Sequence, residues 1–134
     1  MTGYSETPLV KKLGIREGFR VVTVDAPPNY RRLVSPLPAA VKFTPSANFT
    51  TSLVHLFVTN REKLQRMLFE LRETPGPNAV VWVSWPKQSS GVASELTENA
   101  VRAVALPLGF VDVKVCAVTE VWSGLKLVAR RELR

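Results

Sequence analysis

The chain of 134 residues is poor in the residue types that build disulfide frameworks and metal centres. It has one cysteine, Cys116, and one histidine, His55. A single cysteine cannot form an internal disulfide, and no set of residues has the spacing of metal ligands. These absences exclude a disulfide-stabilised scaffold and a structural zinc site of the usual four-ligand kind. They predict a protein without a metal, in a reducing, cytoplasmic setting.

Long apolar runs are missing as well. No stretch approaches the roughly 20 apolar residues that a membrane-spanning helix needs, and the first residues lack the basic and apolar segments of a signal peptide. We therefore expect no membrane association. The content of hydrophobic residues, 46%, and of charged residues, 22%, is ordinary for a globular protein. The length predicts a single domain over residues 1–134.

Acidic residues are in the minority, because 18 lysines and arginines face 11 aspartates and glutamates and give a net charge of +7. Such an excess can attract an anionic partner. The basic residues are scattered in pairs, however, and they lack the interleaved aromatic residues of nucleic-acid-binding modules. The charge favours a solvated basic surface, gives weak support to an anionic ligand, and argues against nucleic acid as a partner.

What the chain does have is an alternation of strand-like and helix-like segments. The apolar runs 53–58 and 79–85 are typical of strands that are buried on both faces, as in a parallel sheet. Further strands are expected at 19–25, 41–44, 111–117 and 125–130, and helices at 8–13, 29–34, after Asn60 and after Thr97. Valines alternate with polar residues in 111–117, which predicts one apolar face. The last two strands predict a β-hairpin.

This order of elements predicts an α/β fold, a three-layer sandwich of Rossmann-like type. Right-handed crossovers limit the possible topologies. Together with the closing hairpin they favour a mostly parallel six-stranded sheet of order 2-1-3-4-6-5, whose last strand in the chain is antiparallel to its neighbours.

Several motifs resemble an uncharacterised bacterial family that is known only as a domain of unknown function. They are Gly3-Tyr4-Ser5-x-Thr7-Pro8-Leu9-x-Lys11-Lys12-Leu13-Gly14-Ile15, Trp85-Pro86-Lys87-x-Ser89-x-Gly91-Val92, Asp112-Val113-Lys114-Val115-Cys116-Ala117-Val118 and Trp122-Ser123-Gly124-Leu125. Together they cover the chain nearly end to end. The resemblance implies a degenerate class I methyltransferase-like fold, in which the sheet is shortened by about one strand–helix unit. It implies no established activity, substrate or partner.

The turn after the first strand is where a class I methyltransferase holds S-adenosylmethionine. Such enzymes place an acidic residue and a glycine-rich turn there, whereas here Asp25 is followed by Ala26-Pro27-Pro28. Proline has no N–H to donate, and its ring prevents a ligand from approaching the backbone closely. The second strand also ends without the acidic residue that would bind ribose hydroxyls. The sequence therefore predicts no binding of S-adenosylmethionine and no cofactor.

In open α/β sheets, ligands bind beyond the carboxyl ends of the strands, at the point where the strand order reverses. After the run 79–85, a lysine, two hydroxyls, a glycine and an aromatic ring could hold a phosphate or carboxylate beneath a flat group. The candidate ligand-binding residues are Asp25, Asn60, Trp85, Lys87, Ser89, Ser90 and Gly91. The alternative is a structural turn, with Trp85 simply part of the core.

Catalytic candidates are few. His55 lies inside an apolar strand, which favours a hydrogen-bonded core residue over a base. Cys116 has no histidine near it in the sequence, and an inert thiol is favoured over a nucleophile. Asp25 is either a general base at a strand end or a cap on the proline turn, and the turn is preferred.

The leading hypothesis is a non-enzymatic domain that binds a small anionic ligand, or another protein, at the strand-end edge of the sheet. One alternative is an enzyme that uses Asp25, Lys87 and Ser89 on an unknown substrate. A nucleic-acid-binding protein is the other alternative, and it rests on charge alone. The sequence leaves the oligomeric state and the identity of the ligand open.

Overall fold

The computed structural model describes residues 7–130. Tyr4 and Ser5 of the N-terminal motif therefore lie outside the described residues. No described helix is both long and apolar enough to cross a membrane.

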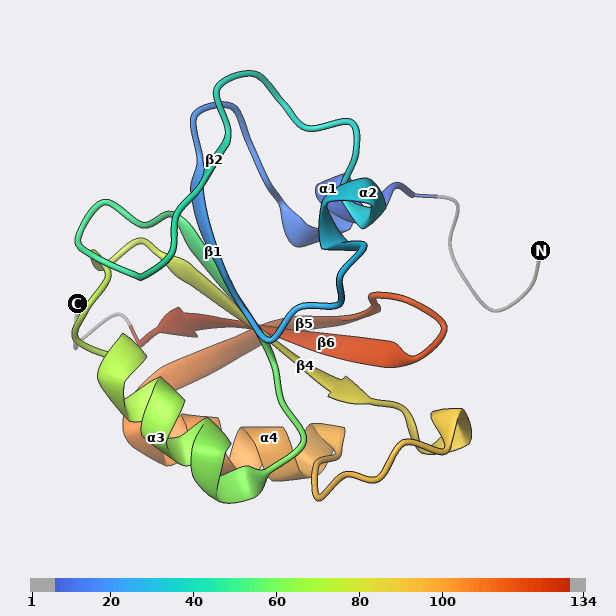
Figure 1. Ribbon diagram of the computed structural model, residues 1–134. Coiled ribbons are helices and arrows are strands. Elements are labelled where there is room, and N and C mark those ends of the chain that lie inside the picture. The colour runs from blue at the N-terminus through green and yellow to red at the C-terminus, as the bar shows by residue number, and fades with distance from the viewer. Residues whose placement is uncertain (1–6, 131–134) are drawn as a thin grey trace.

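A six-stranded sheet runs through the molecule in the order β2-β1-β3-β4-β6-β5 (Figure 1). Its strands are β1 (Arg20–Val24), β2 (Lys42–Phe43), β3 (Leu53–Phe57), β4 (Val80–Pro86), β5 (Phe110–Ala117) and β6 (Trp122–Ala129). The first four strands are parallel, and β6 is antiparallel to both β4 and β5. The predicted α/β class, strand order and terminal hairpin are confirmed.

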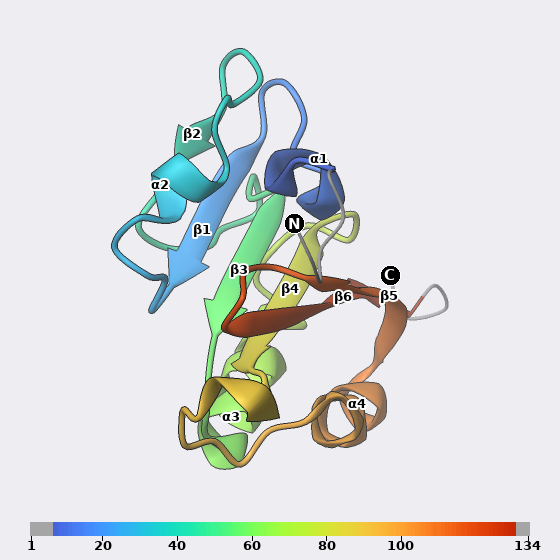
Figure 2. The same cartoon turned by 90° about the vertical axis from the view of Figure 1, so that its right-hand side faces the viewer.

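Helices cover both faces of the sheet, so the molecule has three layers. They are α1 (Leu9–Leu13), α2 (Tyr30–Leu33), α3 (Arg61–Leu71) and α4 (Glu98–Ala105), with short 3₁₀ helices at Gln88–Ser90 and Leu106–Leu108. The longer helices α3 and α4 pack on one face, and the short helices α1 and α2 lie over the other (Figures 1 and 2).

The central strand β3 shows why both faces must be covered, because all five of its residues are buried. Leu53, His55 and Phe57 lie on the side of α1 and α2, and Val54 and Leu56 belong to the core under α3 and α4. Side chains alternate between the faces of a strand. Leaving either face of this strand in water would expose large apolar side chains, at a cost of about 25 cal/mol per Å².

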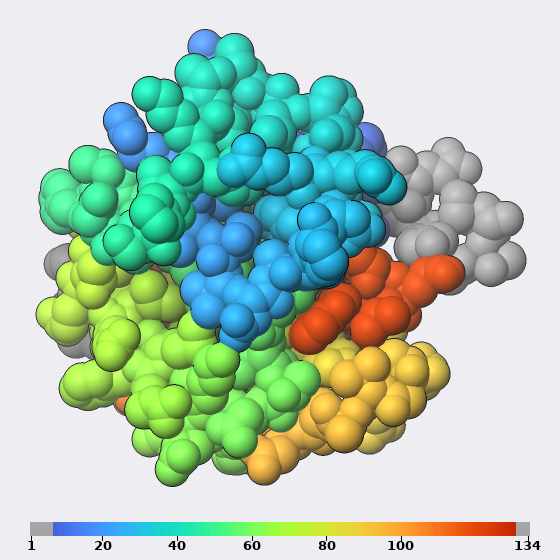
Figure 3. Space-filling model, in the orientation of Figure 1, coloured from blue at the N-terminus to red at the C-terminus, as the bar shows by residue number. Residues whose placement is uncertain are grey.

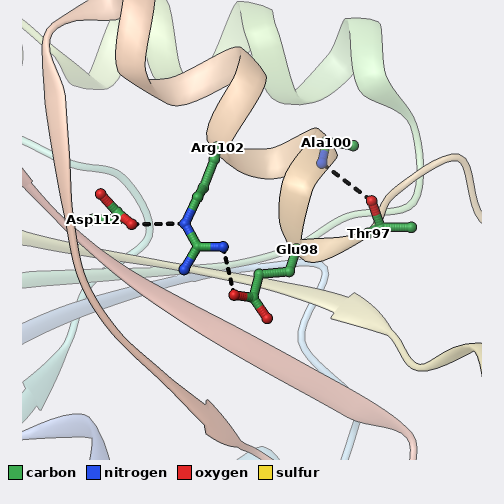
Figure 4. A network of polar contacts seen from close by, with 5 residues as sticks. All are labelled: Thr97, Glu98, Ala100, Arg102 and Asp112. Atoms are coloured by element: carbon green, nitrogen blue, oxygen red, sulfur yellow. Dashed lines mark hydrogen bonds and ion pairs between the residues drawn. The ribbon is translucent and has the colours of Figure 1, made fainter.

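Both predicted helix starts are confirmed by their capping bonds. The side chain of Asn60 accepts a hydrogen bond from the backbone N–H of Lys63 at 2.8 Å, and Thr97 accepts one from that of Ala100 at 3.1 Å (Figure 4). These bonds satisfy N–H groups that have no partner within the helix.

Hydrogen bonds between side chains link α4 to the edge strand β5. Arg102 donates from Nε to Asp112 Oδ2 at 2.7 Å, and its Nη1 pairs with Glu98 one helical turn earlier (Figure 4). The hydrogen bond from Arg102 holds the pKa of Asp112 below its ordinary value. The pattern of apolar residues alone gave no sign of this contact.

The connection from β2 to β3 has no helix, and the sequence predicted none between these two strands. Residues 44–52 cross from β2 to β3 as a loop, and Ala47 packs against the core under α3. Between this loop and α3 lies a groove of about 310 Å³. The loop is thinner than a helix, which leaves the face of β1 incompletely covered.

The prediction of a single apolar face on β5 is wrong. The pairing between β5 and β6 shifts between Asp112 and Lys114, so Val113 is an extra residue that reverses the phase of the strand. Val111 pairs with Val128, whereas Val115 pairs with Leu125 on the opposite face of the sheet. The valines at 111, 113 and 115 are 37%, 49% and 41% exposed. Sequence alternation cannot reveal such a bulge.

Gly124 lets the hairpin lie close to the core. A Cβ atom at this position would be 2.9 Å from a methyl carbon of Val118 and 3.2 Å from the ring of Trp82. Both distances are shorter than ordinary van der Waals contacts, and the neighbouring atoms belong to buried side chains.

We therefore expect Gly124→Ala to lower the free energy of unfolding by roughly 1–3 kcal/mol, the usual cost of overpacking a core. Chemical denaturation measures this change. In a Val118→Ala background the same substitution should cost less, since the nearest methyl groups are gone. Equal costs in the two backgrounds would show that the contact with Val118 is not the cause.

Candidate functional site

Asp25 stands at the carboxyl end of β1 in an uncommon backbone conformation. Its φ angle is 58°, in the left-handed region that aspartate tolerates better than most residues. Its Oδ2 accepts a hydrogen bond from Lys63 Nζ at 2.7 Å, and the two side chains are 57% and 43% exposed. Lys63 belongs to the first turn of α3, which follows β3. The ion pair therefore joins the ends of β1 and β3, where the strand order reverses.

A cleft of about 620 Å³ opens beside Asp25, between the ends of β1 and β2. Its polar lining includes Thr23, Thr44 and the guanidinium of Arg31, which lies 4.2 Å from the ring centroid of Phe43. In Figure 3 the turn after β1 occupies the centre of the visible face, between the segment around β2 and the turn of the β5–β6 hairpin. A carboxylate, an arginine and two hydroxyls thus share one opening of the size of a ligand site.

A second, more apolar cleft lies on the other side of Pro27. It has a volume of about 440 Å³ and lies between the β1–α2 segment and the hairpin turn. Leu33, Val118 and Trp122 supply much of its apolar wall. Because Pro27 lines both clefts, the proline turn separates a polar opening from an apolar one.

Behind the polar cleft, three buried polar side chains form a chain of hydrogen bonds. The hydroxyl of Tyr30, in α2, lies 2.8 Å from His55 Nδ1, and His55 Nε2 lies 2.7 Å from Ser84 Oγ in β4. Burial lowers the pKa of His55 to about 3 and raises that of Tyr30. The interpretation of His55 as a hydrogen-bonded core residue agrees with this geometry.

Two residues of the predicted site serve the framework. Trp85 is 6% exposed and packs in the core under α3 and α4. Asn60 caps α3, and that cap fixes the helix turn from which Lys63 reaches Asp25.

The segment after β4 forms a tight turn. Ser90 donates through Oγ to the carbonyl of Lys87 and accepts from the N–H of Val92, and Gly91 adopts a φ of 78°. Ser89 is exposed, and the N–H of Lys87 donates to the carbonyl of Val121 in the hairpin turn. The residues that line the cleft beside Asp25 include none of the segment 87–91.

Sequence reasoning missed three side chains near this edge: Arg31, Lys63 and Glu95. Glu95 Oε1 accepts from the N–H of Arg61 at 2.8 Å, and its own N–H donates to the carbonyl of Thr59. The N-terminus of α3 therefore already has a carboxylate from the loop before α4. Only Lys63 could have been found from the sequence. It lies three residues after the predicted cap Asn60, and this spacing places it in the first turn of α3, near the strand ends.

Cys116 is half-buried in β5. Burial raises the pKa of its thiol, and the nearby Lys12 and Lys114 lower it by a smaller amount. Within residues 7–130, no three His, Cys, Asp or Glu side chains lie together as metal ligands would. These facts give no support to a thiolate nucleophile.

Comparison with known proteins identifies the architecture. No family model and no curated sequence matches the chain. A SAM-dependent methyltransferase from Aquifex aeolicus matches with a TM-score of 0.67 and 17% identity, over 90% of this chain and 87% of that one. The PH0226 protein from Pyrococcus horikoshii matches with a TM-score of 0.65 and 10% identity, over 92% and 87%. The fold is that of class I methyltransferases.

A third similar structure is a complex between the Haloferax volcanii Trm112 methyltransferase activator and a putative methyltransferase. It matches with a TM-score of 0.64 and 9% identity, over 91% of this chain and 86% of that one. Identities this low establish the fold, and the reaction has to be argued from the residues of the site.

The comparison corrects the leading hypothesis from the sequence, a non-enzymatic binding domain. Structures that share the fold over most of both chains are described as methyltransferases. The alternative of an enzyme, which the sequence also raised, agrees better with these similarities.

The fold implies S-adenosylmethionine, but the residues at the ends of β1 and β2 do not fit it. Pro27 and Pro28 line the cleft and have no N–H to offer a ligand. The end of β2 presents Phe43 and Thr44, with Arg31 over the phenyl ring, so no carboxylate stands there to bind ribose hydroxyls. The ends of β1 and β2 therefore lack both the glycine turn and the acidic residue with which this fold holds the cofactor.

We expect the protein not to bind S-adenosylmethionine. Isothermal titration calorimetry checks this, with the Aquifex aeolicus methyltransferase as the positive control for the ligand. Micromolar affinity would show that the proline turn accommodates the cofactor.

The burial of His55 predicts that the protein becomes less stable in acid. The ring binds protons near pH 6.5 when the chain is unfolded and only near pH 3 in the folded state. Its contribution to stability is therefore complete above pH 6.5 and is lost progressively toward pH 3. Between pH 7 and pH 5 the free energy of unfolding should fall by roughly 2 kcal/mol from this group.

Urea denaturation at the two pH values measures the change, and His55→Gln is the control because glutamine keeps a polar side chain that does not titrate. The difference between wild type and variant isolates the histidine from the carboxylates. An identical pH dependence in both proteins would contradict the assignment.

Proposed function

We propose that the chain is an enzyme that performs acid–base chemistry on a small anionic substrate in the cleft beside Asp25. The observation that carries this proposal is the Asp25–Lys63 ion pair, which sits at the reversal of strand order and borders an opening of about 620 Å³. Ligands of open α/β sheets bind at this location.

The ion pair gives the two carboxylate oxygens of Asp25 different tasks. Oδ2 is held by Lys63 at 2.7 Å, and no hydrogen bond to Oδ1 is formed within residues 7–130. Oδ1 is therefore the atom that accepts a proton from an O–H or N–H of the substrate. A carboxylate fixed by a second group is better oriented for this transfer than a free side chain.

Arg31 supplies the charge that binds the substrate. Its guanidinium lies over Phe43, and it is not among the arginines that form ion pairs within residues 7–130. Tyr30, the preceding residue, anchors α2 to the core through its bond with His55. An arginine held in this way can form two hydrogen bonds with a carboxylate or phosphate.

The segment after β4 remains a proposed part of the site. The parallel strands β1, β3 and β4 are neighbours at about 4.8 Å spacing, so Lys87 and Ser89 follow a strand roughly 10 Å from Asp25 along the same edge. We propose that Lys87 contacts the far end of an elongated substrate. We further propose, from the sequence motifs, that the chain belongs to the bacterial family of unknown function, and, from its composition, that it is cytoplasmic.

The test begins with a thermal-shift screen of carboxylated and phosphorylated metabolites, because ligands that bind the native state raise its melting temperature. Hits are then incubated with the protein and followed by mass spectrometry. Arg31→Ala should weaken binding about tenfold or more, as expected for a lost charge-assisted bond. Arg32→Ala is the matched control, since Arg32 is the next residue, is exposed and does not line the cleft.

Asp25→Asn should keep binding and lose turnover. Asparagine has nearly the same size, and it tolerates the left-handed conformation of this position, so the fold should be retained. If Arg31→Ala and Arg32→Ala bind a hit equally well, or if Asp25→Asn turns it over at the wild-type rate, the proposal is wrong.

A further inference from the structure

The β5–β6 hairpin turns one face away from α3 and α4. On that face Lys114 and Lys126 lie directly opposite each other in the antiparallel register, and Val111 is on the same side. Leu125 and Leu127, on the other side, belong to the core under α3 and α4. Figure 2 shows the hairpin running below α1, with α4 on its far side.

Two more cations gather around this lysine pair. Trp82, which pairs with Lys126 across the sheet, donates from Nε1 to the carbonyl of Leu13 at 3.0 Å. This bond brings the segment after α1, with Arg16, to the side of Lys126. Burial lowers the pKa of Lys126, and the charges of Lys114 and Arg16 lower it further. Lys12 donates from Nζ to the carbonyl of Ala117 at 3.2 Å, at the end of β5. Three residues of strand span about 10 Å, so the four positive groups border a compact surface.

This arrangement is costly in the isolated chain. Like charges directly opposite each other in an antiparallel pair are destabilising. The ion pairs of residues 7–130 join carboxylates to Lys63, Arg66 and Arg102. None of these ion pairs includes Lys114 or Lys126 of the hairpin, or Lys12 and Arg16 beside it, so within residues 7–130 no ion pair compensates the repulsion.

We propose that this surface, formed by Lys12, Arg16, Lys114 and Lys126, docks an acidic segment of a protein partner. Carboxylates from the partner would neutralise the repulsion between the two strands. The surface lies on the hairpin rather than at the strand-end cleft, so the inference is independent of the proposed activity.

The apolar surroundings favour a protein over nucleic acid. Val111, on the same face, is 37% exposed, and Val113 in the adjoining bulge is 49% exposed. Apolar side chains of a peptide can cover these valines, whereas a phosphate backbone leaves them in water. The exposed large aromatic residues, Phe49 and Phe69, belong to the β2–β3 loop and α3. In the hairpin strands, Phe110 is buried and Trp122 is half-buried with its ring edge-to-face with that of Phe57, so the hairpin has no fully exposed aromatic ring for stacking bases.

The test uses fluorescence anisotropy with a short labelled peptide of glutamates interspersed with leucines. A peptide with glutamine in place of glutamate is the probe control. The double variant Lys114→Gln/Lys126→Gln is compared with Arg20→Gln/Lys42→Gln. Arg20 and Lys42 are also exposed cations in register on adjacent strands, at the opposite edge of the sheet, so both doubles remove the same charge.

The hairpin double should weaken binding of the acidic peptide about tenfold or more, and the control double should weaken it less than about twofold. The melting temperature of the unliganded hairpin double should equal or exceed that of wild type, because the repulsion is removed. This readout separates lost binding from lost folding.

Four results would overturn the proposal. They are equal weakening by both doubles, equal binding of the glutamine peptide, and no binding of the acidic peptide at low salt. The fourth is tighter binding of a single-stranded oligonucleotide or of phosphatidylserine vesicles, lost in the hairpin double, which would assign the surface to those ligands instead.

Discussion

Burial of the central strands on both faces is the constraint on which the rest of the structure depends. β3 has no exposed residue, and β4 is buried along nearly its whole length. Such strands are stable only if other elements cover each face, and parallel neighbours require crossovers that place their carboxyl ends at one edge. The meeting of Asp25 and Lys63 is a direct consequence, since they follow the adjacent strands β1 and β3.

The same constraint explains the chain of polar groups inside the protein. A histidine in β3 has no access to water, and both of its ring nitrogens need partners within the protein. Tyr30 and Ser84 provide them from the neighbouring α2 and β4. These two hydrogen bonds connect α2, β3 and β4 and so fix α2 relative to the sheet. With α2 they also fix the wall of the polar cleft, since Tyr30 and Arg31 line it.

Much of the fold was predictable because its signals are local. Apolar runs gave β3 and β4, Asn60 and Thr97 marked the starts of α3 and α4, and the closing hairpin gave the strand order. The bulge at Val113 was not predictable, since it depends on the register against β6. The sequence placed no helix between β2 and β3, but it did not predict that Ala47 of this loop packs on the core, because a single apolar contact forms no periodic pattern.

The site was predictable only in part. Asp25 could be placed at a strand end from the sequence, but its ion pair joins residues 38 positions apart and depends on the paths of β1 and α3. Trp85 and Ser90 have the right chemistry for a ligand, yet one fills the core and the other closes a turn. Residue type alone does not distinguish a binding group from a structural one when both occur beside the same strand. The sequence raised an enzyme only as an alternative, and the three-dimensional similarity to solved methyltransferase structures is what favours that alternative.

The two outer strands of the sheet have a consequence for behaviour in concentrated solution. β2 is two residues long, and β5 is interrupted by its bulge and carries an exposed lysine. A further strand adds to a sheet only along a long, regular and uncharged border, and natural proteins use short strands, bulges and lysines to prevent that addition. Neither border of this sheet is therefore a template for growth from one molecule to the next, and the folded chain resists polymerisation into fibrils through its own strands.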